Sequence, residues 1–303
     1  MSASQQSGEA TRLGPETLRE VFAEVCARIG VDPDGAELIK FTNNAVFRLR
    51  QVPVVVRIAG STAVRTRVTK VVRVAHWLAA HAVPAVRLLP DVVQPVDVDG
   101  HLATVWQAVP PVGPPPTGAD LARLLREIHG LPPLPDLPPW RPFEEIRQRL
   151  AEAEGITDDE QAWLFDRCDE IEQAVSTLEY ALPPGPIHGD AFLGNLIPGP
   201  DGPVICDFDS TSVGPREWDL TPVALGKLRF RYPGDIHRVL SDAYGFDVST
   251  WDGFPVLRQV RELKLVTSVV PILRSHPRIR EQWRHRFDTF RRGETAATWT
   301  PYR

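Results

Sequence analysis

The sequence contains no run of 18 apolar residues, so it predicts no membrane-spanning helix and no membrane partner. Its three cysteines, Cys26, Cys168 and Cys206, are far apart and form no CxxC pair. This argues against a disulfide framework or a zinc site and favours a reducing, cytoplasmic setting. The basic excess typical of a nucleic-acid groove is also missing, since the formal net charge is −5. We therefore expect no nucleic-acid partner, and a monomer or homodimer that acts on a small molecule.

The first part of the chain reads as a helix followed by strands. Residues 1–14 are polar, have no apolar core typical of a secretory signal, and are predicted to form a disordered tail. Helical spacing of apolar residues predicts helices at 16–30 and 66–81. Runs rich in β-branched and aromatic residues predict six strands, at 38–41, 45–49, 53–58, 85–89, 92–98 and 101–109.

A proline-dense stretch, 110–116, separates this part from a helical remainder. Proline removes a backbone donor and fixes φ, so the stretch is predicted to be a connector. Helical patterns follow it at 117–130, 157–180, 221–231, 235–244, 255–272 and 278–292. The sequence thus predicts an α+β protein with two lobes: a β-rich lobe over 15–109 and a helical lobe over 110–303.

The segment 186–209 carries the chemistry. Two short apolar runs flank a turn that contains Asp201-Gly202, which predicts a β-hairpin. A hairpin brings its two ends together, so Asn195 and Asp207 are predicted to be neighbours. Phosphoryl transfer requires such a set, because the protein's task is to hold Mg²⁺ against the phosphates and to orient the attacking hydroxyl. Carboxylate and amide oxygens are the ligands that Mg²⁺ prefers.

His188-Gly189-Asp190, followed five residues after the Asp by Asn195, has the spacing of the kinase catalytic loop. With His-Gly-Asp in this place, and Trp218-Asp219 after Asp209, the chain resembles the aminoglycoside phosphotransferase family, which also includes choline and homoserine kinases. The resemblance implies a two-lobed, protein-kinase-like fold with ATP and Mg²⁺ as cofactors. It implies that Asp190 is the catalytic base, that Asn195 and Asp207 hold Mg²⁺, and that Asp209 either assists with the metal or satisfies its loop.

The alternative for Asp190, Asn195 and Asp207 is that they are ordinary turn residues, since Asp and Asn favour turns. The three together, in this spacing, favour the catalytic interpretation. His188 is expected to brace the loop through hydrogen bonds and not to transfer protons. Asp219 is likewise expected to be structural, as an anchor of the loop that follows the metal site.

The β-rich lobe is expected to bind the nucleotide, but it departs from the usual kinase pattern. The phosphate-loop position has no glycine and offers Asn43 and Asn44 instead. Arg57 falls where the family has Lys or Arg, and its guanidinium can bind phosphate oxygens bidentately. The acidic partner that the family commonly has on the next helix is missing, because Val71 occupies its position. By position alone, the strand containing Gln107 and Val109 is expected to contact adenine.

The acceptor is expected on the helical lobe, with Phe192, Trp218 and Glu262 as candidate contacts. Each has a structural alternative: Phe192 in the core, Trp218 as a loop anchor, and Glu262 on a solvated helix face beside Arg261 and Lys264. The function predicted is transfer of a phosphoryl group to a hydroxyl of an antibiotic, such as an aminoglycoside, or of a metabolite. A housekeeping sugar or amino-alcohol kinase and a nucleotide-binding pseudokinase remain as alternatives, whereas no hydrolase signature is present.

Overall fold

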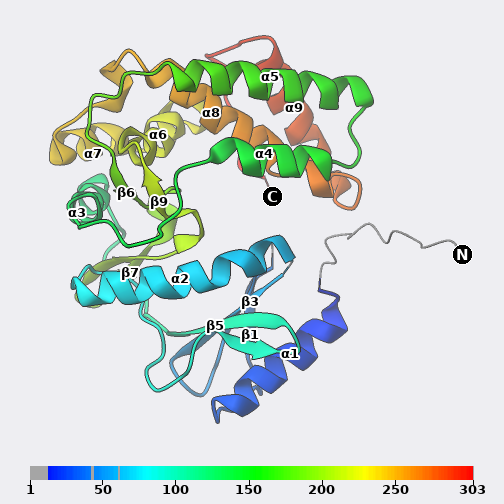
Figure 1. Cartoon of the computed structure of the whole chain (residues 1–303), viewed down its shortest axis with the longest axis vertical. Coiled ribbons are helices and arrows are strands. Elements are labelled where there is room, and N and C mark those ends of the chain that lie inside the picture. Colours follow the sequence, from blue (N-terminus) through cyan, green and yellow to red (C-terminus); the bar gives the residue numbers. More distant parts are fainter. Residues whose placement is uncertain (1–12, 42–43, 61, 303) are drawn as a thin grey trace, which may run out of the picture. The chain divides into compact units, whose positions relative to one another are not determined.

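The computed structural model describes residues 13–41, 44–60 and 62–302, and it divides the chain into two compact units (Figure 1). Unit 1 comprises Met1–Pro116 and Gly194–Thr211, and unit 2 comprises Thr117–Leu193 and Ser212–Arg303. The sequence placed 194–211 in the second lobe, whereas backbone hydrogen bonds tie this segment to unit 1. Ile205 donates to the Pro84 carbonyl (3.0 Å), Val86 donates to the Ile205 carbonyl (3.0 Å), and Gly113 donates to the Pro198 carbonyl (2.8 Å).

Unit 1 is built on an antiparallel sheet of five strands in the order β1-β2-β3-β5-β4. The strands are β1 (Glu37–Phe41), β2 (Asn44–Arg48), β3 (Val54–Ala59), β4 (Val96–Val98) and β5 (His101–Gln107). The predicted strand at 85–89 is wrong, since only isolated bridges form there, at Ala85 and Leu88. Pro84 and Pro90 flank that segment and remove backbone donors, which limits strand pairing.

Two helices cover opposite faces of this sheet: α1 (Pro15–Arg28) and α2 (Thr62–Ala80) (Figure 1). The alternation of side chains along β3 explains the arrangement. Val54, Val56 and Ile58 point to the α1 side and are buried in one core with α1 residues. Arg57 lies between them in the sequence and therefore points to the α2 face.

The predicted hairpin at 196–205 is confirmed. Strands β7 (Leu196–Gly199) and β8 (Gly202–Ile205) pair antiparallel, with Leu196 opposite Ile205 and Gly199 opposite Gly202. A 3₁₀ turn, η2 (Phe208–Ser210), follows β8 and packs against α2. Phe208 is buried with its ring centroid 6.2 Å from that of Trp106 on β5, which anchors the turn to the sheet.

Unit 2 consists mainly of helices. Its α-helices are α3 (Gly118–His129), α4 (Pro142–Ala151), α5 (Asp158–Ser176), α6 (Glu217–Leu225), α7 (Ile236–Tyr244), α8 (Phe254–Thr267) and α9 (Arg280–Arg291). Thr117 and Thr157 begin α3 and α5 with reciprocal capping boxes, as expected from Asp120 and Glu160 three residues later. A small strand pair, β6 (Gly185–Ile187) and β9 (Ser212–Gly214), completes the unit.

Helices α4, α5, α8 and α9 enclose the main apolar core of unit 2. Trp283 and Phe287 of α9 stack at its centre, with ring centroids 5.1 Å apart. Because this core is tightly packed, α8 is a rigid support for the side chains on the other faces of that helix. Throughout the part of the chain that the structure describes, no helix combines the length and hydrophobicity needed to cross a bilayer.

Candidate active site

In unit 1, the hairpin brings the predicted metal-binding residues to its open end. The Cys206 amide donates to the Asn195 carbonyl (2.9 Å), which continues the β7–β8 pairing by one residue. Asn195 is buried, and Asp207 follows Cys206 directly. Asp207 has a left-handed backbone, with φ 71° and ψ 70°, a conformation that costs energy for any residue other than glycine. Such strain is typical of functional turns, and here it redirects the chain from β8 into η2.

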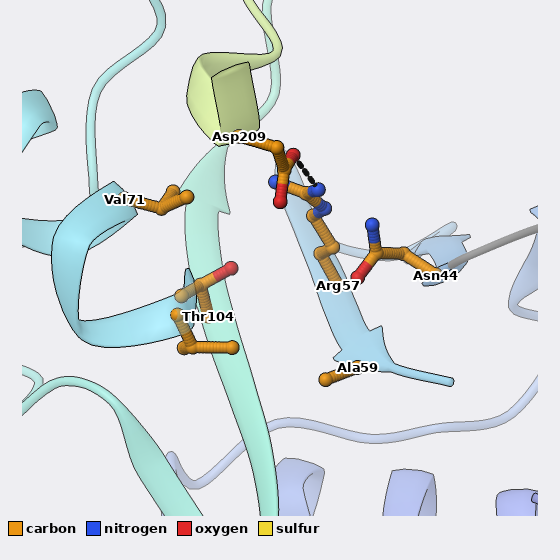
Figure 2. Close-up of a pocket in the computed structure, with 7 residues that line it drawn as sticks. Asn44, Arg57, Ala59, Val71, Thr104 and Asp209 are labelled. Atoms are coloured by element: carbon orange, nitrogen blue, oxygen red, sulfur yellow. Dashed lines mark hydrogen bonds and ion pairs between the residues drawn. The ribbon is translucent and has the colours of Figure 1, made fainter. Parts of the chain in front are cut away.

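Arg57 of β3 forms an ion pair with Asp209 of η2 (Figure 2). The guanidinium nitrogen Nη2 donates to the Asp209 carboxylate, and the same atom lies 3.8 Å from the Asp207 carboxylate. Asn44 of β2 lies beside Arg57, and with its amide turned so that the oxygen faces the guanidinium, that oxygen accepts from Arg57 Nε at 3.3 Å. Arg57 therefore has a partner, although the helix acid expected from the family is missing.

Lys70 of α2 holds the backbone of the same turn. Its ammonium group donates to the carbonyl of Asp209 (2.5 Å) and to that of Thr211 (3.0 Å). Val71, the residue at the position of the missing acid, is buried and lines a small cavity with Arg57, Thr104 and Asp209. The cavity measures about 10 Å³, room for about one water molecule.

Burial of Asp209 raises the pKa of its carboxyl group, but the charge of Arg57 and hydrogen bonds from Asp207 and Arg57 together lower it below the ordinary value. Asp209 is therefore a carboxylate at neutral pH. Arg57 thus lies between the Asp209 carboxylate, with which it pairs, and the Asp207 carboxyl group 3.8 Å away.

The donor set at this end of the hairpin suits Mg²⁺. Two carboxylates and one amide supply hard oxygen ligands, as the ion requires. Within the described residues, no group of three or more His, Cys, Asp or Glu side chains could hold a metal. A cation here would therefore depend on the Asn195 amide oxygen and the Asp207 carboxylate. Asp209 could add only the carboxylate oxygen that does not pair with Arg57.

The predicted adenine-binding strand ends at Gln107, where the backbone is already engaged. The Gln107 amide donates to the Arg87 carbonyl (2.9 Å), and the Ala108 amide donates to the Pro53 carbonyl (2.8 Å). The Gln107 side chain donates to the Leu88 carbonyl at 3.2 Å. Val109 lies two residues beyond the end of β5, and its contact with adenine stays a prediction. Asn43 lies outside the described residues.

In unit 2, the loop after β6 carries Asp190, and a buried carboxylate shapes that loop. Asp219, at the start of α6, accepts hydrogen bonds from the amides of His188 (2.6 Å) and Gly189 (2.7 Å). Its Oδ2 also lies 3.0 Å from His129 Nε2. The structural role expected for Asp219 agrees with this geometry. His188 is also buried, and its Nδ1 lies 3.3 Å from the Asp190 amide, which suits the expected bracing role.

Asp190 itself pairs with an arginine. Arg261 Nη1 donates to Asp190 Oδ1 at 2.6 Å, from a side chain that is only 10% exposed. Burial would raise the pKa of Asp190, but the positive charges of Arg261 and Lys264 lower it to about 2. The carboxylate is thus fully ionised at neutral pH and is a weak proton acceptor.

Two of the predicted acceptor contacts are occupied by protein partners. Trp218 is buried, its indole N–H donates to the Gly189 carbonyl (2.8 Å), and its ring lies against Trp140. Glu262 is 3% exposed and accepts from the Nε atoms of Arg229 and Arg258, each at 2.7 Å. These contacts argue against the predicted substrate roles and for structural ones. The solvated face predicted around Glu262 is wrong, because that carboxylate and Arg261 are both buried. Phe192 is partly exposed.

Arg261 and Lys70 belong to these sites but were not predicted as members from the sequence. Arg261 falls four residues after the buried Leu257 on α8, so helical periodicity places a cation on the inner side of the helix. A charged residue at such a position calls for a partner, which was the available signal. Lys70 had no comparable signal, since its acceptors are backbone carbonyls far away in the sequence.

Comparison with known proteins identifies the family of this chain. Residues 39–262 match the model of the phosphotransferase enzyme family, which covers most of the chain and both sites. The chain belongs to the phosphotransferase enzyme family. It is therefore a small-molecule kinase. No curated protein sequence matches this phosphotransferase.

Solved structures share the fold of this phosphotransferase at low sequence identity. An amicoumacin kinase, hAmiN, is 14% identical with a TM-score of 0.68, over 96% of this chain and 98% of that one. The choline kinase LicA from Streptococcus pneumoniae is 14% identical with a TM-score of 0.66, over 90% and 97%. A choline/ethanolamine kinase family protein from Mesorhizobium loti is 15% identical with a TM-score of 0.63, over 91% and 93%. The predicted α+β, protein-kinase-like fold is confirmed.

Proposed function

We propose that this phosphotransferase moves the γ-phosphoryl group of ATP to a hydroxyl group of a small molecule, with Mg²⁺ as the metal. The observation that carries the proposal is the buried loop that holds Asp190 through hydrogen bonds to Asp219. Asn195 follows Asp190 by five residues, and the left-handed turn at Asp207 follows the hairpin. The hAmiN structure was determined with AMP-PNP and a related phosphotransferase structure with ATP, which supports ATP as the donor.

The proposed reaction forms a bond between the acceptor oxygen and the γ-phosphorus and breaks the bond between that phosphorus and the ADP oxygen. Asp190 accepts a hydrogen bond from the acceptor hydroxyl and aligns its oxygen for in-line attack. With a pKa of about 2, Asp190 orients the hydroxyl and does not deprotonate it in advance. The hydroxyl proton leaves late, once the bond to phosphorus lowers its affinity for the oxygen, and passes to the Asp190 carboxylate, which releases it to solvent.

On the donor side, we assign Asn195 and Asp207 to hold Mg²⁺, which neutralises charge on the phosphates. Arg57 contributes a guanidinium for phosphate oxygens, and Asn44, which supports Arg57, is assigned to the same site. Val109 and Gln107 are assigned to the adenine side, Val109 through its backbone.

The experiment is Mg·ATP turnover by the wild type and Asp190→Asn, measured as acceptor-dependent ADP release with hydroxylated antibiotics, sugars and amino alcohols. The proposal predicts that the variant binds Mg·ATP normally and loses kcat by about 100-fold or more. Nucleotide binding without turnover in either protein would instead support a regulatory pseudokinase. Asp190→Asn turnover equal to that of the wild type would contradict the assignment.

A further inference from the structure

The contacts of Arg57 differ from what the family resemblance predicts. The resemblance predicts an acid on the helix after β3, and this chain has the apolar Val71 there. Asp209 supplies the acid instead, from a turn more than a hundred residues later in the sequence. We propose that Asp209 is the positioning residue for Arg57, replacing the missing helix acid, and that it is not a primary metal ligand. This inference rests on the proposed function.

Two contacts hold Asp209 in that role, and a third supports its partner Arg57. Its carboxylate pairs with Arg57 Nη2, and its own carbonyl accepts from Lys70 of α2 at 2.5 Å. Asn44 lies beside Arg57 (Figure 2), and its amide oxygen, when turned toward the guanidinium, accepts a hydrogen bond from it. Arg57 and Asp209 are both mostly buried, at 16% and 17% side-chain exposure, so the pair is shielded from water and salt.

The helix still takes part, but through its lysine and not through an acid. In the expected arrangement, one helix carboxylate would orient the cation of β3. Here α2 holds the turn η2 in place through hydrogen bonds from Lys70 to its backbone. This places the Asp209 carboxylate against Arg57. Val71 adds an apolar side chain to the lining of the cavity beside the pair. Arg57 therefore still has an acidic partner, but that acid is Asp209 of the turn η2 and not a residue of α2.

The proposal gives Asp207 and Asp209 different roles, Mg²⁺ binding and positioning of Arg57, and this difference can be tested. Steady-state kinetics of Asp209→Asn and Asp207→Asn should be measured as functions of ATP and of free Mg²⁺. We expect Asp209→Asn to raise KM for Mg·ATP by at least tenfold and to leave the Mg²⁺ concentration for half-maximal activity unchanged. Asp207→Asn should shift that Mg²⁺ concentration instead. A shift in Mg²⁺ dependence for Asp209→Asn equal to that for Asp207→Asn would overturn the inference.

Coupling between the two partners provides a second readout. Because Asp209 acts through Arg57, Arg57→Gln and Asp209→Asn together should raise KM no further than Arg57→Gln alone. Fully additive effects would show that the two residues act separately and would contradict the proposal.

A rescue variant separates positioning from general damage to the fold. Val71→Glu, combined with Asp209→Asn, returns an acid to the cavity that Val71 shares with Arg57, and should recover most of the lost affinity for ATP. Val71→Gln in the same background is the matched neutral control and should not. Equal effects of Glu and Gln would contradict the inference. If the wild type neither binds nor turns over Mg·ATP, the proposed function fails first, and this inference falls with it.

A separate observation in unit 2 concerns the acceptor. Arg261, beside Asp190, is an arginine with five N–H donors, and among the described residues its only hydrogen bond is the one to Asp190. Lys264, one turn further along α8, and Arg149 of α4 both contact the Glu145 carboxylate, at 3.3 Å and 2.9 Å. These five side chains carry three positive charges and two negative ones.

Cations next to Asp190 oppose the binding of an acceptor with several positive charges and favour one with a negative charge. The remaining donors of Arg261 suit a carboxylate or phosphate oxygen, which a guanidinium binds bidentately. Arg261 Nη1 already donates to Asp190. An anion bound by the other N–H groups of Arg261 would therefore lie close to the hydroxyl that Asp190 orients. We infer that the acceptor carries an anionic group near the hydroxyl that is phosphorylated, an inference that also rests on the proposed function.

Matched acceptors test this inference. Short hydroxy acids and their amides differ only in the negative charge, and both can be compared with amino alcohols in ADP release. We expect a kcat/KM at least tenfold higher for acids than for amides, and loss of this preference in Arg261→Gln. Arg258→Gln is the control, since this arginine of the same helix pairs with Glu262 instead. The inference is overturned if no acid reacts faster than its amide, or if the preference survives in Arg261→Gln.

Discussion

At the scale of single residues, the ion pair between Arg261 and Asp190 lowers the pKa of the carboxyl group that we propose to be catalytic. With a pKa of about 2, below the ordinary 3.8, Asp190 remains ionised down to acidic pH. Its ionisation therefore stabilises the folded state above the ordinary pKa, and this contribution is lost as pH falls toward 2. Between about pH 5 and pH 8, Asp190 should add no slope to kcat.

Arg261→Gln should change that profile. Without the guanidinium, burial dominates and raises the pKa of Asp190, so an acid limb should enter the measured range as kcat is followed from about pH 8 to pH 4. Arg258→Gln, with its charge removed from the same helix but not from Asp190, should keep the wild-type profile. An identical profile for Arg261→Gln would show that the ion pair does not control the ionisation of Asp190.

Asp219 makes a prediction about stability. Its carboxylate accepts from two loop amides while fully buried, so Asp219→Ala leaves those donors without a partner. We expect a loss of about 3 kcal/mol in the free energy of unfolding, measured by urea denaturation with circular dichroism. Asp242→Ala on the surface of α7 is a suitable control, and a similar small change for both would contradict the structural role of Asp219.

At the scale of elements, the sequence predicted most helices and strands because their patterns are local. The helices α1, α3, α7 and α9 match the apolar periodicity within a few residues. The hairpin was predictable from its turn, and with it the pairing of Asn195 with Cys206, the residue before Asp207. The pair of β6 and β9 was not, because each strand has three residues and no recognisable alternation.

Contacts between residues that are far apart in the sequence could not be predicted either. No local pattern connects Arg57 with Asp209, or Asp190 with Arg261, since each contact depends on how whole elements pack. The sequence could indicate only that a cation on a buried strand or helix face needs a partner.

The packing of α3 on α7 gives a prediction at this scale. A Cβ at Gly118, the first residue of α3, would lie 2.4 Å from the Ile236 carbonyl oxygen and 2.9 Å from the Leu240 nitrogen. Gly118→Ala should therefore destabilise the protein by about 1 to 3 kcal/mol, although alanine is the better helix former. Gly14→Ala, where a Cβ meets nothing within 4 Å, is the control. A stabilised Gly118→Ala protein would contradict the close approach.

At the scale of the whole molecule, each unit carries part of the proposed chemistry: unit 1 the cation and metal ligands, unit 2 the catalytic carboxylate. Ligand binding to the folded protein should raise its stability by mass action. We expect Mg·ATP at 100 times its Kd to add about 2.7 kcal/mol, seen as a rise in Tm by calorimetry. Asp190→Asn should show the same rise, whereas Arg57→Gln should show a smaller one. No rise in the wild type would contradict nucleotide binding.

The central claim is that this phosphotransferase forms a phosphate ester on an organic hydroxyl. The most direct measurement is ³¹P NMR of the protein incubated with Mg·ATP and pooled hydroxy acids, sugars, amino alcohols and aminoglycosides. We expect a new monoester resonance that grows with ADP in the wild type and is absent with Asp190→Asn. Release of inorganic phosphate alone, or ATP left unchanged beside every acceptor, would contradict it.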